Sequence, residues 1–372
     1  MESFYVVPED VEKEILSRLT VKSLLRFKCV CKSWHVLIES QTFIDFHLSK
    51  AATEEDNCLV LHRRRDFTKE YVASVLCTQT LSLLVDLEFP YFEDNKMGIS
   101  IVGSCNGLVC LCDNGHLFAV FNPATREFKA LPILPSASLL PNEEFDFKAA
   151  AFGYDPITKD YKVLQISSIF NRHRLDHYLF QIYTLSTNTW REIDAAMPAY
   201  FDEMYPLINT YRKGVHHWSA YEAILSFDIN REVFGTIKLP TPTPPWHNQT
   251  LSLLNGSLAT IIYHLEARCK SFDIWVMKEY GVESSWTKQY TIGPLAIEMP
   301  LGFWKGGELL METRKGKLIL YDLHTRKTKR LLGHGHPRPL QFYTYVESLV
   351  LIKNKNQDVP RLLGHQNSAH LM

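Results

Sequence analysis

The chain has 372 residues, of which 46% are apolar and 12% aromatic, so it can bury a substantial core and is not a disordered protein. Forty basic residues against 41 acidic ones leave a net charge of -1, which argues against general binding to nucleic acids or membranes, because both need a basic surplus. The length exceeds the usual size of one domain and therefore favours a small module followed by a larger one.

The N-terminal residues and the cysteines indicate the compartment and argue against a metal site. The start, Met1 to Tyr5, is acidic and poor in apolar residues, so we expect no secretory signal, and we expect the cytoplasm, with the nucleus as an alternative. Eight cysteines are scattered without a C-x-x-C pair, which predicts reduced thiols and neither a structural zinc site nor any other metal or cofactor. No apolar run approaches the roughly 20 residues that cross a bilayer.

The first 50 residues show the spacing of short helices. Pro8 stands where a first helical residue is expected, and Val11, Ile15 and Leu19 recur four residues apart, which predicts one apolar face. Thr20 is expected to cap a second helix. A third helix is marked by Val30, Trp34, Leu37 and Ile38. Three short helices in about 40 residues bury little surface, so we expect this module to need a partner.

The periodicity then changes to that of short strands. We predict a helical module over 1–48, a linker over the polar and acidic residues 49–56, an all-β domain over 57–352 and a polar tail over 353–372. The β region repeats one hairpin pattern, in which an aromatic residue and Asn or Asp precede a polar turn. These hairpins are expected over 121–128, 154–161, 183–190, 227–234, 272–286 and 321–328.

The spacing of the hairpins predicts a propeller. The last three steps between closing residues are 44, 52 and 42 residues, which fits the period of about 40–50 residues of propeller blades. The first two steps are 33 and 29 residues, so the early repeats are irregular or mark two hairpins of one blade. Further turns, predicted to form the inner hairpins of blades, are Asn106-Gly107, Lys213-Gly214, Asn255-Gly256 and Gly306-Gly307. At about 45 residues a blade, six or seven blades are expected.

The N-terminal motif resembles a plant F-box. The similarity covers Val7 to Leu19 and Val21 to Ile38, and it departs from the family where Val7 replaces the usual Leu and Thr20 the usual Pro. The remainder resembles the F-box-associated region of plant F-box/kelch-repeat and S-locus F-box-like proteins. The stretches that carry this second resemblance are 104–109, 122–126, 152–155, 224–228, 274–277 and 285–288.

The resemblance implies a three-helix F-box followed by a kelch-like β-propeller, and the work of a substrate receptor in an SCF (Skp1-cullin-F-box) ubiquitin ligase. The F-box would bind a Skp1-like adaptor, which joins a cullin, while the propeller binds a protein target. The chain itself would be non-catalytic, since ubiquitin transfer needs only proximity of the target. An S-locus type ribonuclease, which is basic and would want an acidic binding face, and an immune receptor are two expected kinds of target.

The residues expected on the adaptor-binding face are Pro8, Ile15, Leu16, Leu19, Leu24, Leu25, Val30 and Trp34. Some of them, Trp34 above all, are equally suited to the internal core of the module. In the propeller, Trp246 follows a proline-rich loop and is a candidate target contact, although packing on the rim explains it as well. His216-His217 and His334-Gly335-His336 are interpreted as structural or solvated residues, because alternation along a strand points adjacent side chains to opposite faces.

Two other readings remain open. The chain could be a Skp1-binding scaffold outside any cullin complex, or a propeller that binds carbohydrate or catalyses a reaction. The last reading predicts a polar cluster with perturbed titration in the central channel, which nothing in the sequence marks. No phosphate-binding glycine loop, serine-hydrolase elbow or zinc-protease motif is present.

Overall fold

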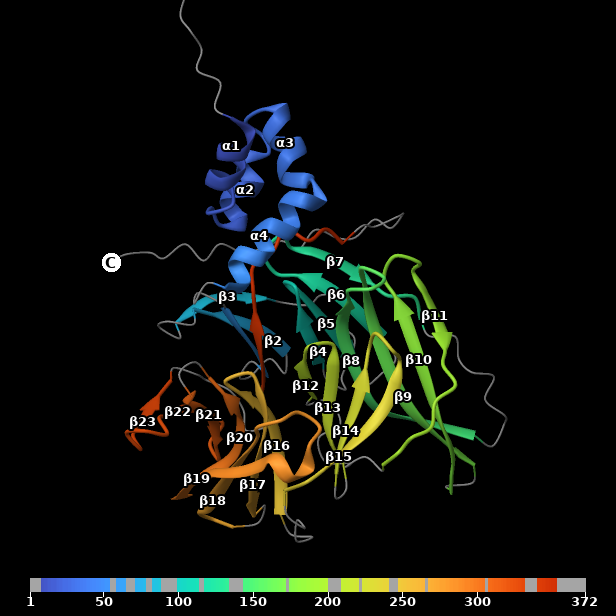
Figure 1. Cartoon of the computed structure of the whole chain (residues 1–372), viewed down its shortest axis with the longest axis vertical. Coiled ribbons are helices and arrows are strands. Elements are labelled where there is room, and N and C mark those ends of the chain that lie inside the picture. Colours follow the sequence, from blue (N-terminus) through green and yellow to red (C-terminus); the bar gives the residue numbers. More distant parts are fainter. Residues whose placement is uncertain are drawn as a thin grey trace, which may run out of the picture.

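A small helical module stands on one side of a β-propeller in the computed structural model (Figure 1). The structure describes residues 8–53, 58–64, 71–77, 82–87, 99–113, 117–133, 143–171, 174–199, 209–220, 223–240, 247–264, 267–304, 307–331 and 340–352. None of the helices in these ranges is long and apolar enough to cross a bilayer.

Four helices form the first module, one more than expected: α1 (Glu9–Leu16), α2 (Val21–Phe27), α3 (Lys32–Glu39) and α4 (Gln41–Thr53). Pro8 caps α1 from outside the helix, so the helix begins one residue later than predicted. Thr20 caps α2 as expected, because its side chain accepts a hydrogen bond from the backbone N–H of Ser23.

The predicted linker over 49–56 is wrong for its first five residues, because α4 continues through Thr53. The reason is a tertiary contact of Lys50, which the local pattern could not show. Its Nζ lies 2.6 Å from Oε1 of Glu14 on α1 and 4.8 Å from the ring centre of Phe46. The last turns of α4 are therefore fixed against α1 rather than released into a polar connection. Residues 54–56 lie outside the described ranges.

The described strands form six sheets of four strands, within the expected range of six or seven blades. All strand pairs are antiparallel, and within each sheet strands that follow one another along the chain lie side by side. The first three sheets contain β24 (Gln341–Tyr345), β1 (Cys58–Arg64), β2 (Tyr71–Leu76) and β3 (Leu83–Leu87); β4 (Ser100–Cys105), β5 (Leu108–Asp113), β6 (Leu117–Asn122) and β7 (Glu127–Ala130); and β8 (Glu143–Asp155), β9 (Asp160–Asn171), β10 (Arg174–Thr184) and β11 (Thr189–Glu192).

The other three sheets follow the same order along the chain. They contain β12 (Asn209–Arg212), β13 (Val215–Ala220), β14 (Ala223–Asp228) and β15 (Val233–Lys238); β16 (His247–Leu254), β17 (Ser257–His264), β18 (Lys270–Met277) and β19 (Trp286–Leu295); and β20 (Ile297–Phe303), β21 (Leu309–Thr313), β22 (Leu318–Tyr321) and β23 (Thr328–Arg330).

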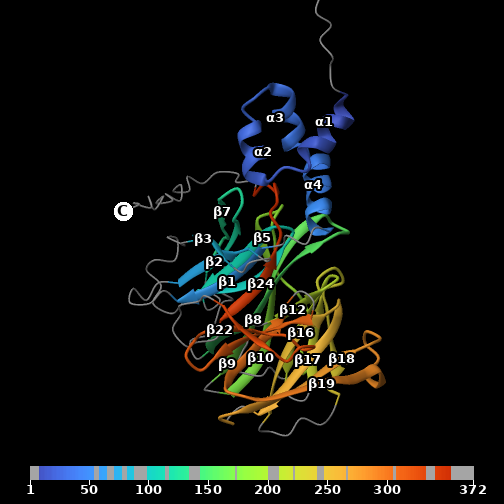
Figure 2. The ribbon, with the colours of Figure 1, turned by 90° about the vertical axis from the view of Figure 1, so that its left-hand side faces the viewer.

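The propeller is closed by its last strand. β24 comes from the C-terminal end of the domain and pairs with β1, the first strand, in the register Cys58↔Tyr345 to His62↔Gln341. One sheet is thus built from both ends of the domain, and Figure 2 shows β24 beside β1 and β2. The core lies between neighbouring sheets; one cluster joins Val75 of β2, Val109 of β5 and Tyr345 of β24.

The predicted hairpin turns are confirmed except at 272–286, where Phe272 and Asp273 lie inside β18 and the turn follows only after Met277. Gly306 of the predicted Gly306-Gly307 turn lies outside the described ranges. Four of the confirmed turns begin with the same kind of side-chain hydrogen bond. Asn122, Asp155, Asp228 and Asp322 each accept, through Oδ1, hydrogen bonds from the backbone N–H groups two and three residues later. The hairpins at 154–161 and 183–190 both lie in the sheet β8–β11. The short second step therefore marks two hairpins of one blade, which was one of the two alternatives. Asn106-Gly107, Lys213-Gly214 and Asn255-Gly256 have positive φ and join the two inner strands of their sheets.

Candidate functional site

The helical module leaves aliphatic side chains in solvent. Ile15 on α1 is 56% exposed and Val30, just before α3, is 62% exposed. Val11 and Val36 are also exposed, and we call these four residues the docking face. A shallow hollow runs along α1 between Asp10 and Leu19. Because large exposed apolar side chains that gather on one small module mark an interaction surface, this face is the first candidate site.

The eight residues predicted for adaptor binding fall into three groups. Pro8, Ile15 and Val30 are exposed, and Leu19, Leu25 and Trp34 are partly buried against the module's core. Leu16 and Leu24 are 1% and 0% exposed, so the structure places them inside the module and they present no surface to a partner. Ile15 and Leu16 are neighbours on the same predicted stripe, but successive residues of a helix point about 100° apart. Val11 and Val36, which are also exposed, were not among the eight.

The module is braced across its helices. Nε2 of His47 on α4 lies 3.0 Å from the carbonyl oxygen of Leu19, and Lys50 also donates to Oγ of Ser17. The hydrogen bond from Lys50, followed by that from Arg18, lowers the pKa of Glu14 below its usual value. These contacts fix α1 on α4 and so hold the docking face in one shape.

A segment from the far end of the chain completes the core of this module. After β24, residues 346–352 leave the propeller and run along the module; we call them the C-terminal strap. Leu349 of the strap is 2% exposed and packs in the same apolar cluster as Leu16, Leu24 and Phe43. The expectation that 57–352 belongs to the propeller alone is therefore wrong for Leu349, which lies in the core of the helical module, whereas Ile352 at the end of the strap packs in a cluster of the propeller.

The propeller holds the strap through the turn between β6 and β7. The Nδ2 group of Asn122 donates to the carbonyl oxygens of Ser348 and Val350, at 3.1 and 2.9 Å. The backbone N–H of Ile352 donates to Oε2 of Glu127 at 2.8 Å, and burial raises the pKa of that carboxyl. The strap thus contacts the propeller through these hydrogen bonds and through Ile352, and it contacts the helices through Leu349.

The strap also passes close above the turn between β4 and β5. Gly107 has φ +80°, and a Cβ at this position would lie 2.3 Å from Oγ of Ser348. Any side chain would therefore collide with the strap as well as strain the backbone. Gly107, which was predicted as a turn residue, therefore also leaves the space that the strap occupies.

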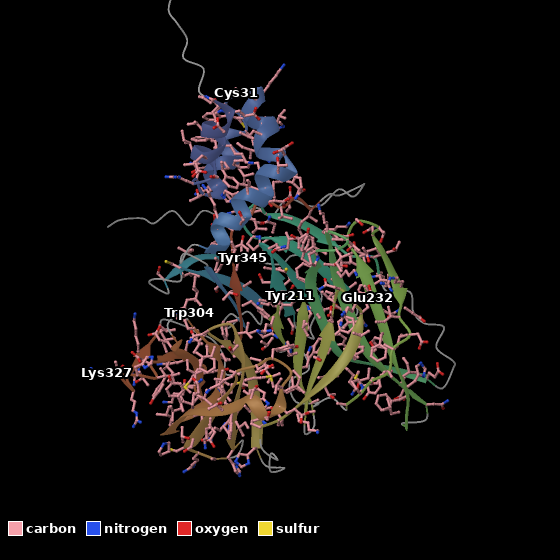
Figure 3. The ribbon with its side chains drawn as sticks, in the orientation of Figure 1. Cys31, Tyr211, Glu232, Trp304, Lys327 and Tyr345 are labelled. Carbon is pink, nitrogen blue, oxygen red and sulfur yellow. The ribbon has the colours of Figure 1, made fainter. Side chains whose placement is uncertain are left out.

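A second candidate site is a cavity of about 260 Å³ at the centre of the propeller. Its walls come from all six innermost strands, β4, β8, β12, β16, β20 and β24. The side chains that could act chemically include Tyr211 and His216, and Figure 3 shows Tyr211 in the interior. Burial lowers the pKa of His216 to about 3 and raises that of Tyr211, so both are neutral near pH 7. No carboxylate or ammonium group is among the described residues that line the cavity.

The other histidine of the predicted pair has structural contacts. His217 is fully buried, with Nδ1 3.0 Å from the carbonyl oxygen of Thr210 and Nε2 2.7 Å from the hydroxyl of Tyr280. Burial lowers its pKa to about 4. His216 instead packs against the rings of Tyr211 and Trp218. The two residues are therefore part of the core of the sheet β12–β15, in agreement with the structural interpretation.

Several predicted features fall outside the described residues, namely Trp246, His334-Gly335-His336 and the polar tail from 353. Across the described ranges, no three His, Cys, Asp or Glu side chains are grouped so that they could hold a metal ion. The seven cysteines whose side chains are described are all free thiols.

Comparison with known proteins agrees with both halves of the architecture. Residues 6–46 match the model of the F-box domain, and residues 56–332 match that of the F-box associated beta propeller domain. The chain is 27% identical to F-box protein CPR1 of Arabidopsis thaliana, over 93% of this chain and 89% of that protein. It is 29% identical to F-box protein At3g07870 of the same plant, over 92% and 90% of the two chains.

A third relative has a slightly higher sequence identity than these two and also matches most of both chains. The chain is 30% identical to F-box/kelch-repeat protein At3g23880 of Arabidopsis thaliana, over 85% of this chain and 87% of that protein. The helical module is thus an F-box and the β-domain an F-box-associated propeller, and the chain belongs to the family of plant F-box proteins that carry this propeller.

Proposed function

We propose that the chain is the substrate-recognition subunit of an SCF ubiquitin ligase, in which the F-box binds a Skp1-like adaptor and the propeller binds a protein target. The observation that carries the proposal is the docking face, since Ile15 and Val30 are more than half exposed although Leu349 of the strap already completes the core of the module. Burial of one such side chain contributes about 1.5–3 kcal/mol, so a partner that covers the four residues gains a large part of a stable interface.

The strap supports the second half of the proposal. A ligase subunit without chemistry of its own acts by holding a target near the loaded ubiquitin carrier, and such proximity is effective only when the geometry is fixed. The connection from α4 to β1 is not the only link between the two domains. Leu349 of the strap lies in the F-box core, and Asn122 of the propeller donates a hydrogen bond to the strap. The propeller would therefore have a fixed orientation relative to the adaptor that binds the F-box.

The proposal is tested by affinity capture from plant extract with the double variant Ile15→Asp and Val30→Asp. The wild-type chain is expected to capture a Skp1-like adaptor and a cullin, and the variant to lose both. A control with the same two added carboxylates, Gln41→Asp and Ser49→Asp, changes exposed polar residues of α4 and should capture both. Leu16→Asp is unsuitable because it would place a charge in the F-box core. Equal capture by wild type and double variant would contradict the proposal.

The same experiment separates the alternatives. A scaffold outside the ligase would capture the adaptor without cullin. A propeller enzyme would need an acid, base or nucleophile with a pKa near neutral pH, whereas burial moves the pKa of His216 down and that of Tyr211 up, away from neutral pH. Targets are best sought by proximity labelling with the double variant rather than with an F-box deletion. Deletion would expose Leu349, which the F-box helices bury.

A further inference from the structure

Positive charge is concentrated at the outer margin of one blade. Residues 309–330 contain seven Lys or Arg and two acidic residues, a net charge of +5, whereas the other 350 residues contain 33 basic and 39 acidic residues, a net charge of -6. The basic side chains are all exposed, and we call them the cationic strip. Its members are Arg314, Lys315, Lys317, Arg326, Lys327, Lys329 and Arg330.

The fold turns this sequence into one continuous edge. β23 is the outermost strand of the sheet β20–β23, and the turns at 314–317 and 322–327 lie at the two ends of β22. Arg330 pairs with Ile319 and so lies near Lys317, while Lys327 lies at the opposite end. Figure 3 shows Lys327 at the margin of the molecule with its side chain pointing outward. Because its members lie at the two ends of β22, the strip is about as long as the four residues of that strand, about 13 Å at 3.3 Å a residue.

Little in the strip is neutralised by neighbouring acids. Arg314 lies 3.6 Å from Glu298, and Lys329 lies near enough to Glu308 to act against the rise that burial causes in the pKa of that carboxyl. No ion pair is formed with any described residue by Lys315, Lys317, Arg326, Lys327 or Arg330. The two acidic residues of the stretch serve the fold instead. Glu312 is 2% exposed and accepts a hydrogen bond from the N–H of Leu340, and Asp322 accepts the N–H groups of His324 and Thr325.

We propose that the cationic strip binds an extended acidic segment of the target protein, a proposal that rests on the function as target receptor. Among the described strands only β22 pairs with β23, so an extended peptide can add to the other edge of β23 through its backbone while its carboxylates meet the Lys and Arg side chains. A short acidic peptide fits the 13 Å strip. Nucleic acids and anionic membranes extend further, over other parts of a chain whose remaining 350 residues have a net charge of -6, which disfavours them. An acidic segment also disfavours a basic ribonuclease as the target.

Charged edge strands can instead serve only to prevent strands of other molecules from pairing with the edge. Glutamate side chains also prevent such pairing. The triple variant Lys327→Glu, Lys329→Glu and Arg330→Glu therefore keeps the edge charged but no longer attracts an acidic peptide. A matched control reverses three exposed cations of other blades: Lys213→Glu, Arg231→Glu and Lys278→Glu. Both triple variants have the same net charge.

The test is fluorescence anisotropy of a labelled (Glu-Ser)₄ peptide with the full-length chain in 0.15 M salt. We expect binding by the wild type that weakens as salt rises, a loss of at least tenfold in the strip variant, and less than twofold change in the control. Unchanged binding by the strip variant, no binding by the wild type, or tighter binding of a short DNA duplex or of phosphoinositide vesicles would overturn the proposal.

Two further measurements keep the result decisive. If the strip variant aggregates, the neutral triple variant Lys327→Gln, Lys329→Gln and Arg330→Gln is measured instead, and a loss of at least threefold is expected; unchanged affinity would overturn the proposal. Adaptor capture by the strip variant should equal that of the wild type, and peptide binding by the Ile15→Asp and Val30→Asp variant should be unchanged. Failure of the strip and failure of the ligase function are therefore distinguishable.

Discussion

Asn122 donates a hydrogen bond from Nδ2 to the carbonyl oxygen of Ser348, at 3.1 Å, although 226 positions separate the two residues. Through this contact a turn of the propeller holds the strap, and Leu349 of the strap lies in the core of the F-box. The F-box is therefore not a pendant module on a linker. Its core is completed by the segment that also follows the closing strand β24.

Asn122→Asp separates the two functions of this side chain. The aspartate can still accept the N–H groups of Ala124 and Thr125, as Asp155, Asp228 and Asp322 do in their own turns, but it cannot donate to the strap. We expect a loss of about 1–3 kcal/mol in the free energy of unfolding and faster hydrogen exchange in residues 346–352. The matched control Asp228→Asn keeps its turn and should change neither quantity. Unchanged exchange in Asn122→Asp would show that the strap is held by other contacts.

Lys162 joins two neighbouring blades, with Nζ 2.8 Å from Asp155 and 2.9 Å from Glu232. Because Asp155 is 1% exposed, Lys162→Met should cost about 3–5 kcal/mol in the free energy of unfolding, measured with urea at pH 7. The control Lys288→Met breaks the exposed pair with Asp273 and should cost about 0–1 kcal/mol. Equal losses in the two variants would contradict the importance of burial.

The cost of Lys162→Met should also depend on pH. Burial alone would raise the pKa of Asp155, but hydrogen bonds from Lys162 and Thr158 outweigh it and bring the pKa to about 2, below the ordinary 3.8. The folded-state pKa is depressed, so this stabilisation is fully present above pH 3.8 and is lost as the pH falls through about 2. The difference between wild type and variant should therefore shrink between pH 5 and pH 2.

The stability that depends on Glu312 should change with pH in the opposite direction. Burial raises the pKa of its carboxyl from 4.5 to about 7, so the folded chain binds this proton more tightly than the unfolded chain. Stability from this proton is complete below pH 4.5 and is lost as the pH rises through 7. Glu312→Gln stays neutral and can still accept the N–H of Leu340. It should match the wild type at pH 5 and be more stable at pH 8, by on the order of 1–3 kcal/mol.

Thermal unfolding at the two pH values measures this difference, and the exposed Glu192→Gln serves as the control, with little change expected at either pH. A Glu312→Gln variant that is less stable than the wild type at pH 8 would show that the ionised carboxylate is needed.

Cys31 provides a reporter inside the proposed interface, next to Val30 and at the end of the F-box away from the propeller (Figure 3). The hydrogen bond from the Ser33 hydroxyl, and then the backbone N–H of Trp34, lower the pKa of this exposed thiol. Iodoacetamide should therefore alkylate it faster than the exposed Cys269 of the propeller. A Skp1-like adaptor should protect Cys31 and leave Cys269 reactive, as read by mass spectrometry. Protection of neither thiol would place the interface elsewhere.

Local patterns predicted much of this fold because their causes are local. The cap at Thr20, the Asx turns and the positive-φ pairs such as Asn106-Gly107 depend on residues within four positions of one another. Closure of the propeller depends instead on pairing of Leu59 with Thr344, and no periodicity connects strands at the two ends of a domain. The strap was assigned to the propeller for the same reason.

The docking face was predicted in part. Spacing identified the apolar stripe of α1, but the stripe is wide enough to include both Ile15, which faces solvent, and Leu16, which faces the core. Which of the two is free depends on where α4 and the strap pack. Val36 was missed because a single exposed valine in a helix has no distinguishing pattern. The cationic strip was visible only as scattered Lys and Arg until β23 proved to be an edge strand.

Calorimetric titration of the purified chain with a purified Skp1-like adaptor tests the claim that the exposed aliphatic side chains of the F-box bind this adaptor. Loss of two buried aliphatic side chains and burial of two carboxylates should weaken binding at least a hundredfold in Ile15→Asp with Val30→Asp. The Gln41→Asp and Ser49→Asp control should bind like the wild type. An unchanged dissociation constant in the docking-face variant would contradict the claim.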